Sequence, residues 1–68
     1  MIPEQNTFYF SEKSSSLLYV IERYYEGVMG ETRVSHLKVA DFKTLKTIYI
    51  KVEDMVVAIE EKRLKQVG

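Results

Sequence analysis

The chain has 68 residues, with ten basic and ten acidic side chains, so its formal net charge is zero. This length allows a single domain, residues 1–68, whose small core usually needs support from disulfides, a bound metal or a partner subunit. There is no cysteine, which excludes disulfides and thiolate metal sites as that support. We therefore expect a homodimer.

The balanced charge disfavours indiscriminate binding of polyanions, although it permits a local basic patch. A hydrophobic content of 46% is typical of a folded protein. The sequence shows no long apolar run and no signal or transit segment. We therefore expect a cytoplasmic protein, or a nuclear one in a eukaryote, that makes no contact with a membrane.

Residues 7–38 contain three stretches of strand type. Residues 7–11 form a short aromatic run, and the polar residues 12–16 suit a hairpin turn. Residues 17–25 fit either a strand or an amphipathic helix, and periodicity alone does not decide between them. Aromatic and β-branched enrichment favours the strand, which also gives the first strand a neighbour. Two glycines mark the next turn, and residues 32–38 form the third strand.

Residues 39–66 read as one long amphipathic helix without glycine or proline. Apolar residues recur every three or four positions: Phe42, Leu45, Tyr49, Val52, Val56 and Ile59. A helix of about 28 residues would span ~42 Å, longer than so small a domain. A second protomer is therefore expected to cover its far part, through Tyr49, Val52, Val56 and Ile59. The β-branched residues 48–52 leave open a break or a strand there.

Together these elements predict an α+β fold, a three-stranded antiparallel sheet followed by one long C-terminal helix. The face under the helix is expected to carry Phe8, Phe10, Leu17, Tyr19, Ile21 and Leu37. An all-α helical hairpin, residues 16–29 against 39–66, is the alternative. A slip of one residue in the second strand would exchange the two faces of the sheet.

No group of residues in the sequence indicates catalysis. His36 is the single histidine, and there is neither a Ser-His-Asp set nor a Gly-rich phosphate loop. Neighbouring carboxylates on the expected helix do not converge on one point. We therefore expect no enzyme, no metal and no cofactor.

The uncovered face of the predicted sheet combines aromatic and cationic side chains. It would carry Tyr9, Lys13, Leu18, Val20, Tyr24, Val34, His36 and Lys38, with Arg23, Tyr25 and Arg33 near the loop end. Such a surface suits single-stranded nucleic acid, because bases stack on tyrosines at ~1–3 kcal/mol each while cations follow the phosphates. The apolar Leu18 and Val20 equally suit a protein interface.

Several short patterns occur in an order known from one family. Residues 18–25 read Leu-Tyr-Val-Ile-Glu-Arg-Tyr-Tyr, a Gly-containing loop follows at 27–32, and His36-Leu37 ends the last strand. Residues 42–46 have an aromatic, two further residues and Leu-Lys at the expected helix start. In this order the chain resembles the positive cofactor four family of single-stranded DNA-binding transcriptional coactivators, in its short bacterial and phage form. The likeness covers most of residues 7–64.

The resemblance implies a curved antiparallel sheet that dimerises through its C-terminal helices and holds single-stranded DNA across the sheet. It implies a base-stacking role for Tyr25, while Arg33 falls near the basic residues of the family's loop and Lys13 near its first-hairpin contacts. Glu22 stands where the family places a basic residue, and Glu26 and Glu31 make the loop less positive.

We therefore expect a non-catalytic, dimeric protein that binds single-stranded DNA or RNA as a regulator of transcription or replication. The expected nucleic-acid-binding residues are Tyr9, Lys13, Arg23, Tyr24, Tyr25, Arg33, His36 and Lys38. The alternative is a small protein-interaction module or inhibitor that acts through its open sheet face, which the balanced charge favours.

Overall fold

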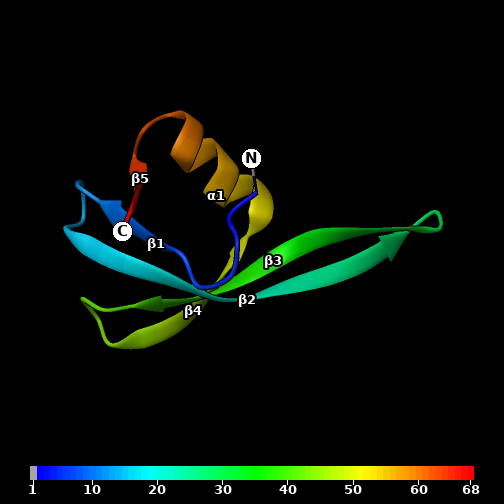
Figure 1. Ribbon diagram of the computed structural model, residues 1–68, viewed down its shortest axis with the longest axis horizontal. Helices are drawn as coiled ribbons and strands as arrows, with labels where there is room; N and C mark the ends of the chain where they lie inside the picture. The colour runs from blue at the N-terminus through cyan, green and yellow to red at the C-terminus, as the bar shows by residue number, and fades with distance from the viewer. Residues whose placement is uncertain (1) are drawn as a thin grey trace.

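The computed structural model describes residues 2–68, which form five strands and one helix (Figure 1). In chain order these are β1 (Phe8–Ser11), β2 (Ser16–Val28), β3 (Glu31–Asp41), β4 (Lys46–Lys51), α1 (Val52–Glu60) and β5 (Leu64–Val67). All strand pairs are antiparallel, and the sheet order is β4-β3-β2-β1-β5. The sheet is therefore open, with β4 and β5 at its two edges.

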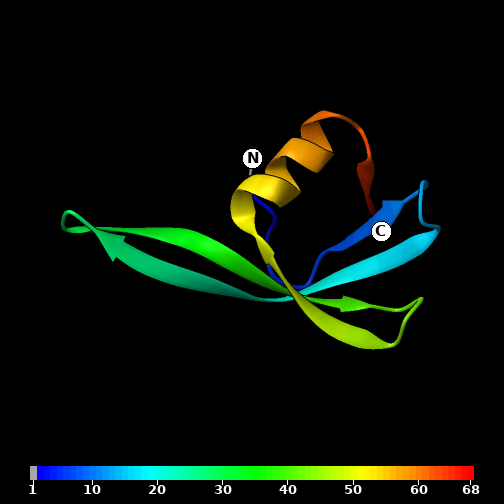
Figure 2. The same cartoon turned by 180° about the vertical axis from the view of Figure 1, so that it is seen from behind.

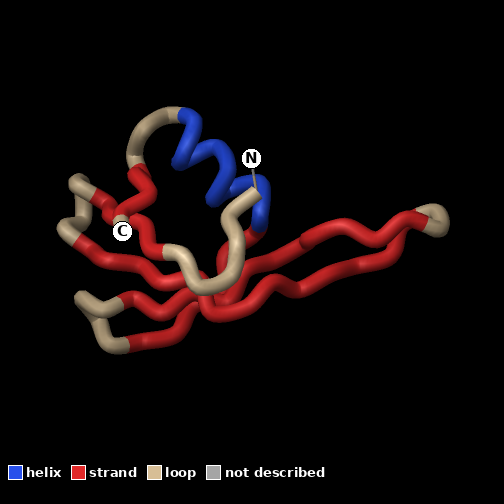
Figure 3. The backbone as a smooth tube through the Cα atoms, in the orientation of Figure 1, coloured by secondary structure: helices blue, strands red, loops and turns tan. Residues whose placement is uncertain are grey.

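The long hairpin of β2 and β3 gives the molecule its elongated shape, 39 × 24 × 18 Å (Figure 1). Its far end extends as an arm beyond the rest of the chain, and the two shorter hairpins, β1–β2 and β3–β4, spread apart at the opposite end (Figure 2). The helix α1 lies on one side of the sheet, where it packs against β3, β4 and β5 (Figure 3). We call the side covered by α1 the inner face and the opposite side the outer face.

The core lies between the inner face and α1. Its buried apolar residues are Tyr9, Leu18, Val20, Val34, Leu37, Val39, Val52, Met55, Ala58 and Leu64. Three of these, Val20, Leu37 and Val39, have no exposed surface at all. Removing such apolar surface from water is the main favourable contribution to folding, so this cluster holds α1 against the sheet.

A β-bulge in β2 changes which face its side chains occupy. The register shifts between Val20 and Glu22, so that Ile21 has no partner opposite it on β3. Because successive strand residues alternate faces, one extra residue reverses the alternation beyond it. Val20 points into the core, whereas Tyr24, an even number of residues later, pairs with the exposed His36 on the outer face.

The predicted fold class is wrong, both as three strands with a long C-terminal helix and as an all-α hairpin. Residues 39–66 form the end of β3, a turn, β4, the nine-residue α1 and a further turn that leads into β5. The Asp41 carboxylate accepts hydrogen bonds from the backbone N–H groups of Lys43 (2.9 Å) and Thr44 (3.4 Å). Such local bonds compete with a helix, and Leu45 then adopts a positive φ of 59°, which ends the turn.

The predicted assignment of the sheet faces is also wrong for the first strands. Phe8 and Tyr19 pair with each other on the outer face, whereas their neighbours Tyr9 and Leu18 pair on the inner face and are buried. Both faces of these strands carry apolar side chains, so alternation alone could not distinguish inside from outside. Leu37 lies in the core as expected.

Candidate nucleic-acid interface

The outer face of β2, β3 and β4 carries two adjacent rows of side chains. Residues paired across antiparallel strands project to the same face of a sheet. The pairing places Tyr24, His36 and Lys51 in one row. The next row contains Glu22, Lys38 and Tyr49. We call these six residues the outer patch.

Two tyrosines of the outer patch meet above the middle strand. The ring centroids of Tyr24 and Tyr49 are 5.9 Å apart, with an angle of 39° between the planes. Tyr49 is 63% exposed and Tyr24 is half-buried, so one ring offers its surface to solvent while the other supports it. Desolvation raises the pKa of Tyr24, and the nearby Glu22 charge and Tyr49 raise it further. The Tyr24 phenol is therefore uncharged at neutral pH and adds no negative charge to the patch.

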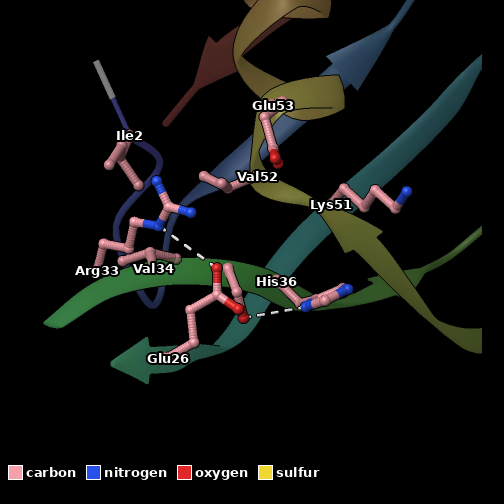
Figure 4. A pocket seen from close by; sticks show the side chains of 9 residues that line it. Ile2, Glu26, Arg33, Val34, His36, Lys51, Val52 and Glu53 are labelled. Carbon is pink, nitrogen blue, oxygen red and sulfur yellow. Dashed lines mark hydrogen bonds and ion pairs between the residues drawn. The ribbon is translucent and has the colours of Figure 1, made fainter. Parts of the chain in front are cut away.

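Three groups that are or can become cationic flank this tyrosine pair. Lys38 lies between Glu22 and Tyr49 in its row, while His36 and Lys51 occupy the row of Tyr24. His36 and Lys51 are exposed and extend to the same side, away from Arg33 (Figure 4). Within residues 2–68 the ion pairs are Arg33–Glu26, Arg63–Glu61 and Lys65–Glu12. Lys38 and Lys51 belong to none of them, so their ammonium groups can contact a ligand.

A second aromatic group continues the outer face toward β1. The ring centroid of Phe8 lies 4.7 Å from that of Tyr19 and 6.4 Å from that of Phe42. The Tyr19 hydroxyl donates a hydrogen bond of 2.6 Å to the Asn6 side-chain oxygen. Because Tyr19 is in register with Ala40, it lies in the row next to Lys38. The outer face is thus aromatic over much of its length.

Two of the predicted binding residues lie away from this face. Tyr9 is 3% exposed in the core, where desolvation raises its pKa. Arg23 pairs with the fully buried Leu37, and its guanidinium donates to the backbone oxygens of Pro3 (3.0 Å) and Ile2 (3.4 Å). Arg23 therefore holds the N-terminal segment against the inner face and is not placed to contact a ligand on the outer face.

The other predicted residues divide between the outer patch and more distant sites. Tyr24, His36 and Lys38 come together in the patch. Tyr25 is 57% exposed on the arm but pairs with the buried Val34, so it points to the face opposite Tyr24. Arg33 forms an exposed ion pair of 3.4 Å with Glu26, also on the arm. Lys13 is exposed in the turn between β1 and β2.

Sequence reasoning missed Lys51 and gave Tyr49 a different role. The sequence pattern predicts both residues in a helix, with Tyr49 in a dimer interface. Within that expected seam, Val52 is buried in the chain's own core, and Val56 and Ile59 pack against it. The signal that could have located β4 is strict alternation, in which Ile48 and Ile50 separate three more polar residues at 47, 49 and 51.

A hollow of about 340 Å³ adjoins the outer patch beside the start of α1 (Figure 4). Its lining residues are Ile2, Glu26, Arg33, Val34, Ser35, His36, Lys51, Val52 and Glu53. Two carboxylates, Glu26 and Glu53, balance its two permanent cations, so the hollow does not favour an anion by charge alone. Among residues 2–68 no group of three or more possible metal ligands comes together.

No protein-family model, curated protein or solved structure matches this chain. The chain is a small α+β domain with a five-stranded antiparallel sheet and one short helix. The closing long helix that the resemblance to the coactivator family implies is replaced by β4, α1 and β5. No helix within residues 2–68 is both long and apolar enough to cross a membrane.

Proposed function

We propose that this chain binds single-stranded nucleic acid across the outer patch and performs no catalysis. The observation that carries the proposal is the pairing register, which sets the Tyr24–Tyr49 ring pair beside Lys38, Lys51 and His36 on an uncovered face. Single-strand-binding proteins combine such stacking surfaces with cations that follow the backbone. Transcription or replication regulation is the role we associate with this activity.

In the proposed complex, a base stacks on the exposed ring of Tyr49 while Tyr24 supports that ring from the other side. Lys38 and Lys51 contact phosphates on either side of the stacked base. Glu22 is the single carboxylate of the patch, and it lowers the attraction for a polyanion. The site therefore suits stacking with few phosphate contacts, which is consistent with the zero net charge of the chain.

The salt dependence of binding follows from the number of phosphate contacts. Each contact to a single strand contributes a slope of about −0.7 in log affinity against log salt. Two lysines therefore give a slope of about −1.4, so affinity should fall about sevenfold between about 50 and 200 mM salt. Fluorescence anisotropy with a labelled oligo-dT of about 20 nucleotides, longer than the roughly 4–16 covered by one small domain, measures this slope.

Three variants test the assignment of residues. Tyr49→Ala should weaken binding about 5- to 150-fold, the equivalent of one lost base stack of ~1–3 kcal/mol, whereas Tyr49→Phe keeps the ring and should bind nearly as the parent. Lys38→Gln should reduce the salt slope by about 0.7. Its charge-matched control is Lys62→Gln, because Lys62 lies in the turn after α1 on the opposite side of the sheet. Equal effects of both lysine variants would contradict the proposed site.

One observation favours the second candidate, a protein-interaction module. Leu45 is 84% exposed and Phe42 is 48% exposed in the turn between β3 and β4, next to the ring of Phe8. Contiguous exposed apolar surface of this kind often contacts proteins. A folded protein that fails to bind oligo-dT and oligo-U at low salt would remove the first proposal and favour this module.

A further inference from the structure

The outward edge of β4 has no strand beside it. Within residues 2–68, β4 pairs only with β3, and the sheet order ends there. The other edge of a terminal strand presents N–H and C=O groups that can pair with another chain. β4 has six residues, from Lys46 to Lys51, which is long enough for such a pairing.

We propose that two copies of the chain pair antiparallel through their β4 edges, with Tyr49 of each copy beside the two-fold axis. A two-fold axis perpendicular to the sheet keeps the inner faces of both copies on the same side. Directly opposite residues must then come from the same face. At the axis, one residue of β4 therefore lies opposite the same residue of the second copy. The axis does not pass between two successive residues such as Ile48 and Tyr49.

Two axis positions keep most of β4 paired, and side-chain chemistry decides between them. With the axis at Tyr49, Ile48 of each copy lies opposite Ile50 of the other copy. In the same way, Thr47 of each copy lies opposite Lys51 of the other. With the axis at Ile48, Ile50 lies opposite Lys46. The first arrangement joins apolar side chains that are already half-buried against the core, whereas the second sets an apolar side chain opposite a charged one.

The second edge strand, β5, is a poorer partner for β4. It has four residues, and Gln66, which pairs with the inner-facing Tyr9, would oppose an isoleucine. Pairing of β4 with β4 also closes as a dimer, whereas repeated pairing of β4 with β5 produces rings or open chains. A single six-residue edge gives an interface at the small end of the range, so we expect a concentration-dependent dimer.

The partner copy would extend the nucleic-acid site, a consequence that rests on the proposed function. The dimer forms one continuous outer face on which two Tyr24–Tyr49 pairs lie on either side of the axis. Each copy contributes its Tyr49 ring and its Lys51 ammonium group to the centre of this face. The occluded length of single strand should therefore double relative to a monomer.

Engineered cysteines test the register, since the parent chain has none. In Tyr49→Cys the two new thiols face each other across the axis at a Cβ separation of about 4.5–5.5 Å, near the range of a disulfide. Thr47→Cys is the control, because its two copies would lie about 14 Å apart, four residues along the strand. Mixing Thr47→Cys with Lys51→Cys should produce a mixed disulfide, since these positions are opposite each other.

The expected result is a mass that rises from monomer to dimer with concentration in analytical ultracentrifugation. Mild oxidation should cross-link Tyr49→Cys and the Thr47/Lys51 mixture, with Thr47→Cys alone at least tenfold slower. A monomer at all concentrations without cross-linking would overturn the dimer, and equal rates for Tyr49→Cys and Thr47→Cys would overturn the register. These measurements need no nucleic acid, so a parent chain that forms the dimer in ultracentrifugation but fails to bind oligo-dT would refute only the proposed function.

Discussion

Replacing Leu37 with alanine should remove a large part of the free energy of unfolding. Leu37 has no exposed surface and lies in the centre of β3, between Arg23 of β2 and Ile50 of β4. Truncation of a buried leucine costs about 2–5 kcal/mol, because apolar contacts are lost and a cavity remains. The total free energy of unfolding of a domain of this length is roughly 3–10 kcal/mol. The variant should therefore be close to unfolding or already unfolded in water.

Urea unfolding followed by circular dichroism measures this change. For a small domain with a slope of about 1 kcal/mol per molar urea, the midpoint should fall by about 2 M or more. Leu37→Met, which nearly conserves volume, should cost less than about 1.5 kcal/mol. Comparison of Leu37→Met with Leu37→Ala shows whether the loss of stability comes from the cavity.

The matched comparison is Leu45→Ala, in which the same side chain is removed from a position that is 84% exposed. An exposed substitution of this kind should change stability by no more than about 0.5 kcal/mol. A long C-terminal helix would instead make Leu45 a core residue of its seam. Equal losses for Leu37→Ala and Leu45→Ala would therefore refute the packing described above.

Two further predictions concern local backbone and charge. Leu45 has a positive φ of 59°, a backbone conformation that glycine adopts without strain. In the same urea assay, Leu45→Gly should therefore leave the free energy of unfolding unchanged or raise it by up to about 1 kcal/mol. A glycine at an ordinary turn position would lower it. A hydrogen bond from Lys65, with its charge, lowers the pKa of Glu12 below 4.5. The Glu12–Lys65 pair therefore stabilises the folded chain above the pKa that Glu12 has in the unfolded chain. This stabilisation is lost as the pH falls through the pKa of Glu12 in the folded chain. Lys65→Met should return the Glu12 pKa toward its ordinary value in an NMR titration, and an unchanged pKa would contradict the pairing.

Strand type was readable in the first half of the chain because aromatic and β-branched residues cluster between turn residues. The predicted stretches 7–11, 17–25 and 32–38 overlap β1, β2 and β3. The second half was misread because residues on β4 and α1 fall by coincidence at spacings of three and four. The Asp41 turn, which separates β3 from β4, depends on a side-chain hydrogen bond that periodicity does not detect.

The candidate site was partly accessible for the same reason. Tyr24, His36 and Lys38 are predictable as aromatic and cationic residues of adjacent strands, and the register brings them together. Tyr9 was misplaced because nothing in its own strand tells one apolar face from the other. Lys51 is not predictable as a site residue from a helical pattern, since a helix would direct that side chain away from the sheet.

The bulge at Ile21 decides, more than the composition of β2 does, which side chains each face of this strand displays. If β2 had a regular pleat and the same sequence, Arg23 would face outward and Tyr24 would face the core. Deletion of Ile21 would remove the bulge without exchanging the faces, because Glu22 would then follow Val20 directly and stay opposite Lys38. In descendants of this chain, a gap at Ile21 is therefore compatible with an unchanged binding surface, whereas loss of the bulge without a deletion would exchange the two faces.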